Sequence, residues 1–396
     1  MKKAIKKYFS KDAIRLMRFK NLVVNRILSI KNVFNSKAIH NKDLISSYNK
    51  ARPFGPQKYL CFAPYKSLYF GTDGNVIACC YNRKHILGNY PSETLNDIWI
   101  GKALNKLRKS IENNDLSLGC HGCLDQLNDG NFGAILSINY DKIPFNKNFP
   151  TLMEFELNTT CNLECIMCDE RFSSCISNRK GLSLQKMVYD DNFVEQLKAF
   201  IPYLYEAKFL GGEPFLIPIY YKIWEQIIDI NPECRIIVQT NATVLSDKAK
   251  VLIEKGNFQF NISIDSFNKE TYENIRKNAS YEDTMNNFEY LYDYCKRKGS
   301  FFGISVCAIQ QNRLELAEIV KFGNDRDFTV YFNRVWTPAE CALWKWNTEK
   351  LLETYDFLKT FTLTGKSEIQ QKNIHHFNEL LQQIHTWYIE AKSEER

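Results

Sequence analysis

The stretch that decides the fold is NTTCNLECIMC, residues 158–168, which contains Cys161, Cys165 and Cys168. It follows residues 152–157, whose side chains alternate as they do in a β-strand. The cysteines are therefore expected in a loop at the carboxyl end of a strand, where barrels and open sheets place their chemistry. Thiolates are the usual protein ligands of iron–sulfur clusters, so this loop is a candidate metal centre.

The count of three cysteines is informative. A closed structural metal site uses four protein ligands, whereas a catalytic site leaves one position open. Three thiolates on a four-iron cluster leave one iron available to a cofactor or a substrate. Taken alone, the triplet is also compatible with zinc, or with cysteines that are merely buried.

Strands and helices alternate on the carboxyl side of this loop. Strands are expected at residues 152–157, 207–210, 235–239, 258–264, 302–308 and 330–332, and helices at 191–201, 219–230, 246–255, 280–298 and 313–324. The alternation predicts an α/β fold with a parallel sheet and crossover helices. About six such units make a full or partial barrel plausible.

The sequence here resembles the radical SAM superfamily, whose hallmark is the spacing CxxxCxxC after the first barrel strand. The resemblance covers roughly residues 150–335 and implies a partial (β/α)6 TIM-like barrel whose three loop cysteines hold a 4Fe-4S cluster. It implies that S-adenosylmethionine (SAM) is bound at the following strand ends by Gly211, Gly212, Glu213, Pro214, Asn241, Ser263, Asp265 and Arg276. The residue before the third cysteine is usually aromatic in the family and is Met167 here, so we expect altered packing beside SAM.

A second set of cysteines precedes the barrel. Twelve residues separate Cys61 from Gly74, four separate Gly74 from Cys79, and Cys120 and Cys123 complete the set. The arrangement resembles the SPASM or twitch module, which implies that these four cysteines hold a second, auxiliary 4Fe-4S cluster. The module normally follows the barrel, and here it comes first and lacks the cysteines for a further cluster. Two alternatives stay open: the cysteine after Cys79 takes its place, or the four thiolates hold structural zinc.

Positive charge is concentrated at the start of the chain. Residues 1–50 hold 13 Lys and Arg against two Asp, a net of +11, so the rest of the chain is at −4 within the total of +7. Apolar and basic residues alternate between positions 14 and 31, as in an amphipathic helix. The segment is interpreted either as a terminal helix packed on the body, which we favour, or as a patch for an anionic membrane surface, a nucleic acid or an acidic partner.

Composition indicates a soluble globular protein in a reducing compartment. Hydrophobic residues make up 44% and charged residues 24% of the chain, and no apolar stretch of about 18 residues is present. Thirteen cysteines without an export signal favour metal binding over disulfides, so a cytoplasmic location is expected.

Four segments are expected along the chain. Residues 1–55 form the basic, partly helical segment and a linker, and 56–147 form the cysteine-rich module. The module is predicted to contain a hairpin at 68–78 and one helix from 92 to about 111. The barrel occupies 148–336, and 337–396 form a helical extension with two helices from 349 onward.

The resemblance implies an enzyme that cleaves SAM reductively to a 5′-deoxyadenosyl radical, which abstracts hydrogen from a substrate. A flavodoxin- or ferredoxin-type protein is the expected electron donor. A peptide or protein side chain is the expected substrate, presented by a separate carrier protein because residues 1–50 are too short for a peptide-binding module. A sugar or cell-surface metabolite is the alternative substrate, and a zinc-stabilised nucleic-acid-binding protein is the alternative class. No catalytic side chain is assigned.

Overall fold

The computed structural model describes residue 39 and residues 41–394. The chain divides into two compact units that interleave along the sequence. The barrel unit comprises residues 66–76, 88–99 and 144 onward, and the cysteine-rich unit comprises 77–87, 100–143 and the chain up to 65. The amphipathic pattern predicted between positions 14 and 31 lies outside the described residues.

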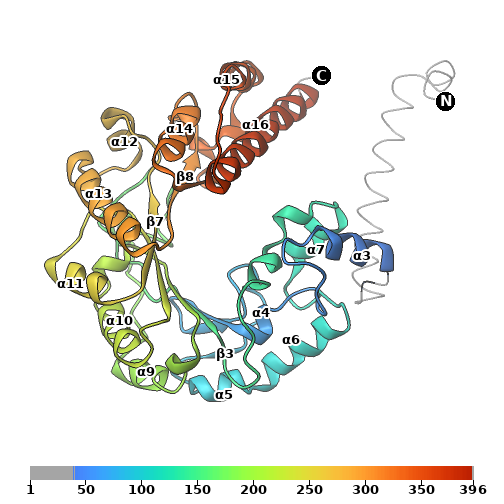
Figure 1. Ribbon diagram of the computed structural model, residues 1–396, viewed down its shortest axis with the longest axis vertical. Helices are drawn as coiled ribbons and strands as arrows, with labels where there is room; N and C mark the ends of the chain where they lie inside the picture. Colours follow the sequence, from blue (N-terminus) through green and yellow to red (C-terminus); the bar gives the residue numbers. More distant parts are fainter. Residues whose placement is uncertain (1–38, 40, 395–396) are drawn as a thin grey trace. The chain divides into compact units, whose positions relative to one another are not determined.

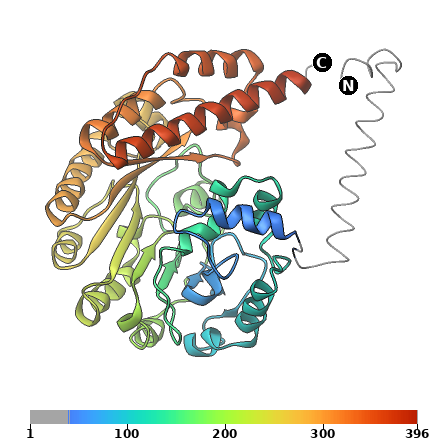
Figure 2. The same ribbon diagram turned by 45° about the vertical axis from the view of Figure 1, so that its right-hand side comes forward.

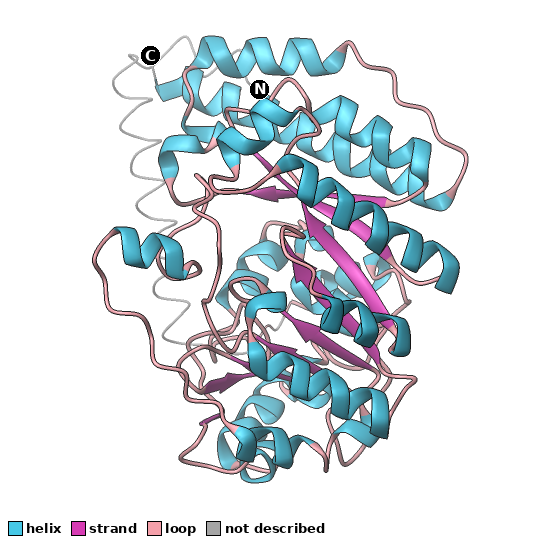
Figure 3. Ribbon diagram, turned by 90° about the vertical axis from the view of Figure 1, so that its left-hand side faces the viewer, coloured by secondary structure: helices cyan, strands magenta, loops and turns pink. Residues whose placement is uncertain are grey.

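An open sheet of nine strands forms the centre of the barrel unit, in the order β3-β2-β1-β4-β5-β6-β7-β8-β9 (Figure 3). Its last six strands pair in parallel and in sequence order. They are β4 (Leu152–Phe155), β5 (Glu206–Phe209), β6 (Arg235–Thr240), β7 (Phe258–Ser263), β8 (Phe302–Ala308) and β9 (Thr329–Arg334). The predicted α/β fold with a partial barrel is confirmed, since the sheet does not close.

Helices cover the outer face of this sheet (Figure 1). They are α8 (Ser174–Arg179), α9 (Asp191–Leu197), α10 (Pro218–Ile230), α11 (Asp247–Lys255), α12 (Lys269–Ile275), α13 (Tyr281–Lys298) and α14 (Leu316–Arg326), with 3-10 turns η3 (Ile201–Tyr203) and η4 (Pro214–Leu216). Buried and partly exposed side chains alternate along β6 and β7. The buried set faces the helices: the ring of Trp224 on α10 lies 5.5 Å from that of Phe209 and 5.6 Å from that of Phe258.

The inner face of the sheet is polar instead of apolar. Gln239 donates to the hydroxyl of Ser263 at 2.9 Å, and Asn261 donates to Gln239 at 2.7 Å and to Ser305 at 2.8 Å. These hydrogen bonds cross three strands. A barrel interior is usually filled with bulky branched side chains, whereas hydrogen bonds between polar side chains join the strands on this face.

The predicted hairpin at 68–78 forms, but its first strand joins the barrel sheet. β1 (Ser67–Phe70) pairs in parallel with β4, and β2 (Asn75–Ile77) pairs with the short β3 (Gly88–Asn89). The ring of Phe70 stacks on that of Phe155 at 5.4 Å, and both side chains are fully buried. The hydrophobic contact with β4 therefore holds this strand in the barrel sheet.

The cysteine-rich unit is mostly helical. Its elements are α3 (Lys42–Ala51), α6 (Lys102–Glu112), α7 (His121–Asn128), η1 (Phe132–Ala134) and η2 (Leu136–Tyr140), and α4 (Ala63–Lys66) lies at its boundary. A fully buried ion pair joins the end of α3 to the end of η2, with Arg52 Nε 2.7 Å from Asp141 Oδ2. Arg52 in the predicted linker is therefore anchored to this unit, although most of the linker residues are exposed.

The single helix predicted from 92 to about 111 is wrong. Two helices occupy this stretch, α5 (Leu95–Trp99) in the barrel unit and α6 in the cysteine-rich unit. They are separated because Gly101 adopts an extended backbone conformation at the start of α6.

The two helices predicted after residue 349 are confirmed as α15 (Thr348–Lys359) and α16 (Glu368–Glu394), which follow η5 (Ala339–Cys341) and η6 (Leu343–Lys345). They lie side by side, and α16 packs on β9 (Figure 2). Asn373 on α16 accepts from the backbone N–H of Val330 at 2.8 Å and donates to the carbonyl of Phe328 at 2.8 Å. Among the described residues, no helix is long and apolar enough to cross a membrane.

Candidate functional site

The three-cysteine loop runs from the end of β4 and is anchored by its backbone. The N–H of Glu164 donates to the carbonyl of Lys277 at 3.0 Å, and the N–H of Ile166 donates to that of Ile275 at 2.9 Å. The N–H of Cys168 donates to the carbonyl of Cys165 at 3.0 Å, which closes a turn between two of the thiols. All three cysteines are partly exposed as residues.

The glycine pair after β5 makes a close backbone approach to this loop. A Cβ on Gly212, whose φ is +42°, would lie 2.1 Å from the carbonyl oxygen of Thr160. The N–H of Glu213 donates to that same carbonyl at 2.7 Å. Gly211 has a φ of +78°. Glycine is required here because no side chain fits between the loops that follow β4 and β5.

Glu213 connects two loops of the site through hydrogen bonds to its carboxylate. Its side chain is fully buried and accepts from Thr240 Oγ1 at 2.6 Å, from the N–H of Phe215 at 3.2 Å and from the N–H of Asn241 at 2.7 Å. Burial raises its pKa to about 7, although these donors act in the opposite direction. Both carboxylate oxygens therefore contact the chain itself, and they join the loops after β5 and β6.

Asn241 reaches from the loop after β6 to the first cysteine. Its Nδ2 lies 3.9 Å from Cys161 Sγ and donates to Asn162 Oδ1 at 3.2 Å. Asn162 in turn donates to Thr243 Oγ1 at 2.9 Å. The predicted site residues Cys161, Glu213 and Asn241 are thus brought together by the ends of three neighbouring strands.

Arg276 finds its carboxylate partner within the chain. Its Nη2 lies 2.7 Å from Asp265 Oδ2 in a buried ion pair, and its Nη1 lies 3.9 Å from Cys165 Sγ. Asp265 also accepts from the N–H of Cys307 at 2.7 Å. Burial acts to lower the pKa of Arg276, but Asp265 and Cys165 outweigh it and keep the guanidinium charged. A positive charge therefore stands beside the second thiol.

Two of the predicted SAM contacts lie apart from these interactions. Ser263 accepts its hydrogen bond from Gln239 on the inner face of the sheet. Pro214 begins the 3-10 turn η4 and is buried. Their contact with SAM stays a prediction, as does that of the other residues in the set.

The donor set of the loop fits an iron–sulfur cluster. Burial raises the pKa of Cys161 to about 12 and those of Cys165 and Cys168 to about 11. Such thiols stay protonated near neutral pH unless a metal cation replaces the proton. Among the described residues, no three His, Cys, Asp or Glu side chains are grouped closely enough to hold a single metal ion.

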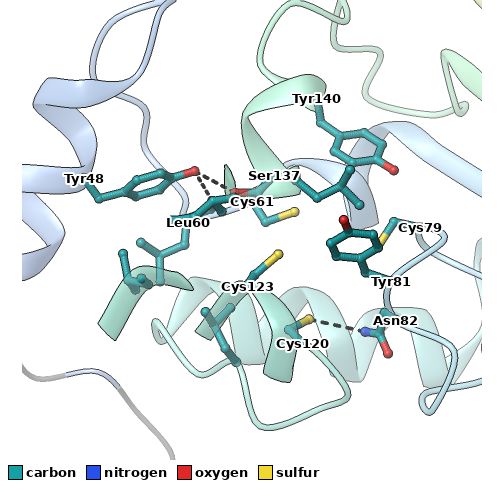
Figure 4. A pocket seen from close by; sticks show the side chains of 14 residues that line it. Tyr48, Leu60, Cys61, Cys79, Tyr81, Asn82, Cys120, Cys123, Ser137 and Tyr140 are labelled. Carbon is teal, nitrogen blue, oxygen red and sulfur yellow. Dashed lines mark hydrogen bonds between the residues drawn. The ribbon is translucent and has the colours of Figure 1, made fainter. Parts of the chain in front are cut away.

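The second set of cysteines lines a cavity in the cysteine-rich unit (Figure 4). Cys61, Cys79, Cys120 and Cys123 all contribute to its wall, together with aromatic and aliphatic side chains. Cys80 is not among the lining residues, which favours Cys79 as the ligand. Four thiols around one cavity match the donor set of a fully ligated cluster.

The cavity wall is positioned by helices from both ends of the unit. Cys120 precedes α7 and Cys123 lies in its first turn. Tyr48 on α3 shares a 2.6 Å hydrogen bond with Ser137 on η2, and both line the cavity. Burial raises the pKa of Cys120 to about 12, and a hydrogen bond from Asn82 acts to lower it.

Sequence reasoning missed several residues that build these sites. Thr240 donates its hydroxyl to Glu213, and the carbonyl of Thr160 accepts from the backbone N–H of Glu213. Ser174 donates to the carbonyl of Cys161 at 3.2 Å, and Asn82 contacts Cys120. Thr240 directly precedes the predicted Asn241 and is the last residue of β6, so its position at a strand end was a usable signal. No local pattern identifies Ser174 or Asn82.

Family models cover both sites. Residues 155–323 match the model of the radical SAM superfamily, so this part of the chain is a radical SAM domain. Residues 61–124 match an iron–sulfur cluster-binding domain, SPASM, so the chain carries a SPASM domain ahead of its barrel. The two domains imply a 4Fe-4S cluster with SAM and an auxiliary iron–sulfur cluster, as predicted.

Curated relatives match part of the chain. A GTP 3′,8-cyclase of Limosilactobacillus fermentum is 24% identical over 50% of this chain and 57% of its own length. An AdoMet-dependent heme synthase of Methanosarcina barkeri is 26% identical over 46% of this chain and 50% of its own length. The chain thus spans little more than half the length of these relatives.

Solved structures of radical SAM proteins resemble the chain weakly. The structure of anSMEcpe with bound AdoMet has a TM-score of 0.40 and 19% identity, covering 53% of this chain and 58% of its own. SuiB of Streptococcus suis bound to S-adenosylmethionine has a TM-score of 0.39 and 14% identity, covering 67% and 61%. Both likenesses are too low to bear on function.

Proposed function

We propose that the protein is a radical SAM enzyme that abstracts hydrogen from a peptide or protein side chain. The observation that carries this proposal is the convergence of three strand-end loops on Cys161: its own loop after β4, the Gly212 loop and Asn241. The resemblance to the radical SAM superfamily implies that cluster and SAM would meet at this edge of the sheet. The match to GTP 3′,8-cyclases covers half of the chain and does not fix the substrate.

The residues around the loop have defined roles in this proposal. Cys161, Cys165 and Cys168 would hold the cluster, which supplies the electron that cleaves bound SAM to methionine and a 5′-deoxyadenosyl radical. Asn241 and Arg276 direct N–H groups toward two of the thiols. Such donors stabilise negative charge on sulfur and thereby favour the reduced state.

SAM is proposed to lie along the same strand ends. Its contacts would come from Gly211, Gly212, Glu213, Pro214, Asn241, Ser263, Asp265 and Arg276. The buried Glu213 and the Asp265–Arg276 pair would also position the loops, since their charged atoms are bonded within the chain. Gly211 and Gly212 are partly exposed and carry no side chain, so a small ligand could approach their backbone closely.

The inner face of the sheet supports a substrate rich in hydrogen-bonding groups. Gln239, Asn261 and Ser305 offer amides and a hydroxyl on adjacent strands. The amides match the alternating donors and acceptors of a peptide backbone. A sugar also bonds such groups and is the alternative. The proposed electron donor is a flavodoxin- or ferredoxin-type protein, and the proposed peptide arrives on a separate carrier.

The test of the proposed chemistry is SAM cleavage by the full chain. Anaerobically reconstituted protein is reduced with dithionite, and 5′-deoxyadenosine is measured by chromatography. Replacing Cys161, Cys165 or Cys168 singly by Ala abolishes its release, whereas Cys234→Ala, a buried cysteine before β6, retains it. Release that is unchanged in all three loop variants overturns the proposal.

The substrate class has its own readout. The protein is incubated with a fully deuterated peptide digest or with a deuterated sugar mixture, and the mass of 5′-deoxyadenosine is recorded. Deuterium transfer from the digest supports the peptide. Deuterium transfer from the sugars alone rules out the peptide substrate and supports the sugar substrate.

A further inference from the structure

Asn82 forms part of the cavity wall beside the auxiliary thiols and is almost fully buried, with 1% of its surface exposed. Its backbone N–H donates to the carbonyl of Cys79 at 3.1 Å, so the residue closes a turn that begins at one cavity cysteine. Its side-chain Nδ2 lies 3.3 Å from the sulfur of another, Cys120 (Figure 4). One short turn therefore joins two of the four thiols.

The orientation of the Asn82 amide is determined by its neighbours. Its Oδ1 accepts from the backbone N–H of His85 at 3.2 Å, and its Nδ2 donates to the carbonyl of Leu118 at 2.8 Å. A backbone N–H can only donate and a carbonyl can only accept, so the reverse orientation would lose both bonds. The second N–H of the amide is thereby directed at Cys120 Sγ.

Gly119 gives independent support for this arrangement. Its φ is +80°, and a Cβ at this position would lie 2.0 Å from Asn82 Oδ1. Glycine is therefore required directly before Cys120, because only glycine leaves room there for the Asn82 amide. The Asn82 amide and Gly119 therefore pack closely against each other.

The donor to Cys120 differs in kind from donors to other cavity cysteines. Cys61 accepts from the backbone N–H of Ala63 at 3.3 Å, and Cys123 accepts from the backbone at Leu136 and Ser137. The donor to Cys120 is a side chain and can be replaced without changing the backbone. Hydrogen bonds to cluster sulfurs are among the factors that set the reduction potential.

We propose that Asn82 is a positioning residue that raises the reduction potential of the auxiliary cluster by donating an N–H to the Cys120 thiolate. The proposal rests on the proposed function, because it needs a cluster in this cavity. The N–H stabilises the more negative sulfur of the reduced cluster more than that of the oxidised one. Asn82 therefore makes the auxiliary cluster easier to reduce.

The test uses the full chain with Cys161, Cys165 and Cys168 replaced by Ala, so that the auxiliary cluster is the source of the signal. Its midpoint potential is measured by an EPR-monitored redox titration. In this parent, Asn82→Leu removes the donor, and Asn82→Asp removes it while keeping an oxygen for the N–H of His85. Asn113→Asp is the charge-matched control, since Asn113 is exposed in the same unit and bonds the carbonyl of Lys109.

Both Asn82 variants are expected to shift the potential to more negative values, while Asn113→Asp leaves it unchanged. After exchange into heavy water, pulsed EPR of Asn82→Leu should also lack the coupling of one exchangeable deuteron that the parent shows. An unchanged potential in both Asn82 variants overturns the proposal, and so does loss of iron from both, which would make Asn82 a structural brace. A parent without iron or sulfide refutes the auxiliary cluster itself, a result that is distinct from a cluster with an unmoved potential.

Discussion

The carboxylate of Glu213 accepts a hydrogen bond of 2.7 Å from the backbone N–H of Asn241, which ties the loop after β5 to the loop after β6. Family resemblance implies that both residues contact SAM. Their mutual bond shows that each also shapes the loop that carries the other. Changes at either residue are therefore expected to affect the geometry of the strand ends as well as ligand contacts.

Glu213→Gln is expected to lower the free energy of unfolding. In Gln, an NH2 group replaces one carboxylate oxygen and would face another donor, either the backbone N–H of Asn241 or the Thr240 hydroxyl. Such a buried pair of donors costs about 1–3 kcal/mol. Denaturant unfolding of the apoprotein measures this directly. Glu233→Gln, at an exposed position, is the control and should change stability by no more than about 0.5 kcal/mol. Equal stability of the two variants would contradict the bracing role.

Gly212→Ala is expected to displace the cysteine loop. The new Cβ would meet the carbonyl of Thr160 at 2.1 Å, and the residue after Thr160 is Cys161, a proposed cluster ligand. Gly181→Ala is a matched control, because Gly181 also has positive φ, +67°, but has no atom within 4 Å of an added Cβ. The control should lose about 1–2 kcal/mol of stability and keep its iron. Gly212→Ala should lose more stability and bind less iron and sulfide per chain.

Asp141→Asn is expected to destabilise the cysteine-rich unit. Arg52 and Asp141 are both fully buried, so removing one charge leaves the other without compensation, at about 3–5 kcal/mol. Urea unfolding and the iron content of reconstituted protein are the measurements. Glu195→Gln breaks an exposed pair with Lys198 and should cost less than about 1 kcal/mol. A similar decrease in the free energy of unfolding in both variants would contradict this prediction, because the buried Arg52–Asp141 pair would then contribute no more than an exposed pair.

Acid should weaken the packing of α16 on β9 through His376. Burial lowers the pKa of His376, whose Nδ1 lies 2.8 Å from the carbonyl of Val330. The unfolded chain therefore takes up the proton first, so this contribution is complete above about pH 6.5 and is lost as the pH falls through the lowered pKa of the folded state. The midpoint of urea unfolding, followed from about pH 7.5 to about pH 5, should fall less steeply in His376→Gln than in the wild type. His375→Gln, with an exposed ring, should retain the wild-type slope.

The parallel sheet was predictable because strand-like and helix-like runs alternate after Cys168, and the strands β6 and β7 also show local periodicity. Along β7 the buried Phe258 and Phe260 alternate with partly exposed Gln259 and Asn261, and this pattern is visible in the sequence alone. The cysteine loop was predictable from spacing. Boundaries shifted by a few residues, as at β9, because the ends of elements depend on neighbours that periodicity does not contain.

Features that depend on distant partners were not predictable. The parallel pairing of β1 with β4 joins Ser67 to Leu152, and no local pattern marks either as a partner of the other. The pairing of Arg276 with Asp265 was missed for the same reason, since a free arginine and a paired one have the same sequence signature. The four auxiliary cysteines were recognisable, but the amide that contacts one of them was not, because asparagine is common in turns.

The interleaving of the two units restricts how this protein can be divided. A cut at residue 144 would remove β1, β2 and β3 together with the cysteine-rich unit. The edge of β4 would then be left with unpaired backbone groups, a condition that promotes aggregation. The SPASM domain therefore cannot be removed by a single cut in the chain. A soluble minimal barrel must retain residues 66–76 and 88–99, which would have to be joined to the shortened chain.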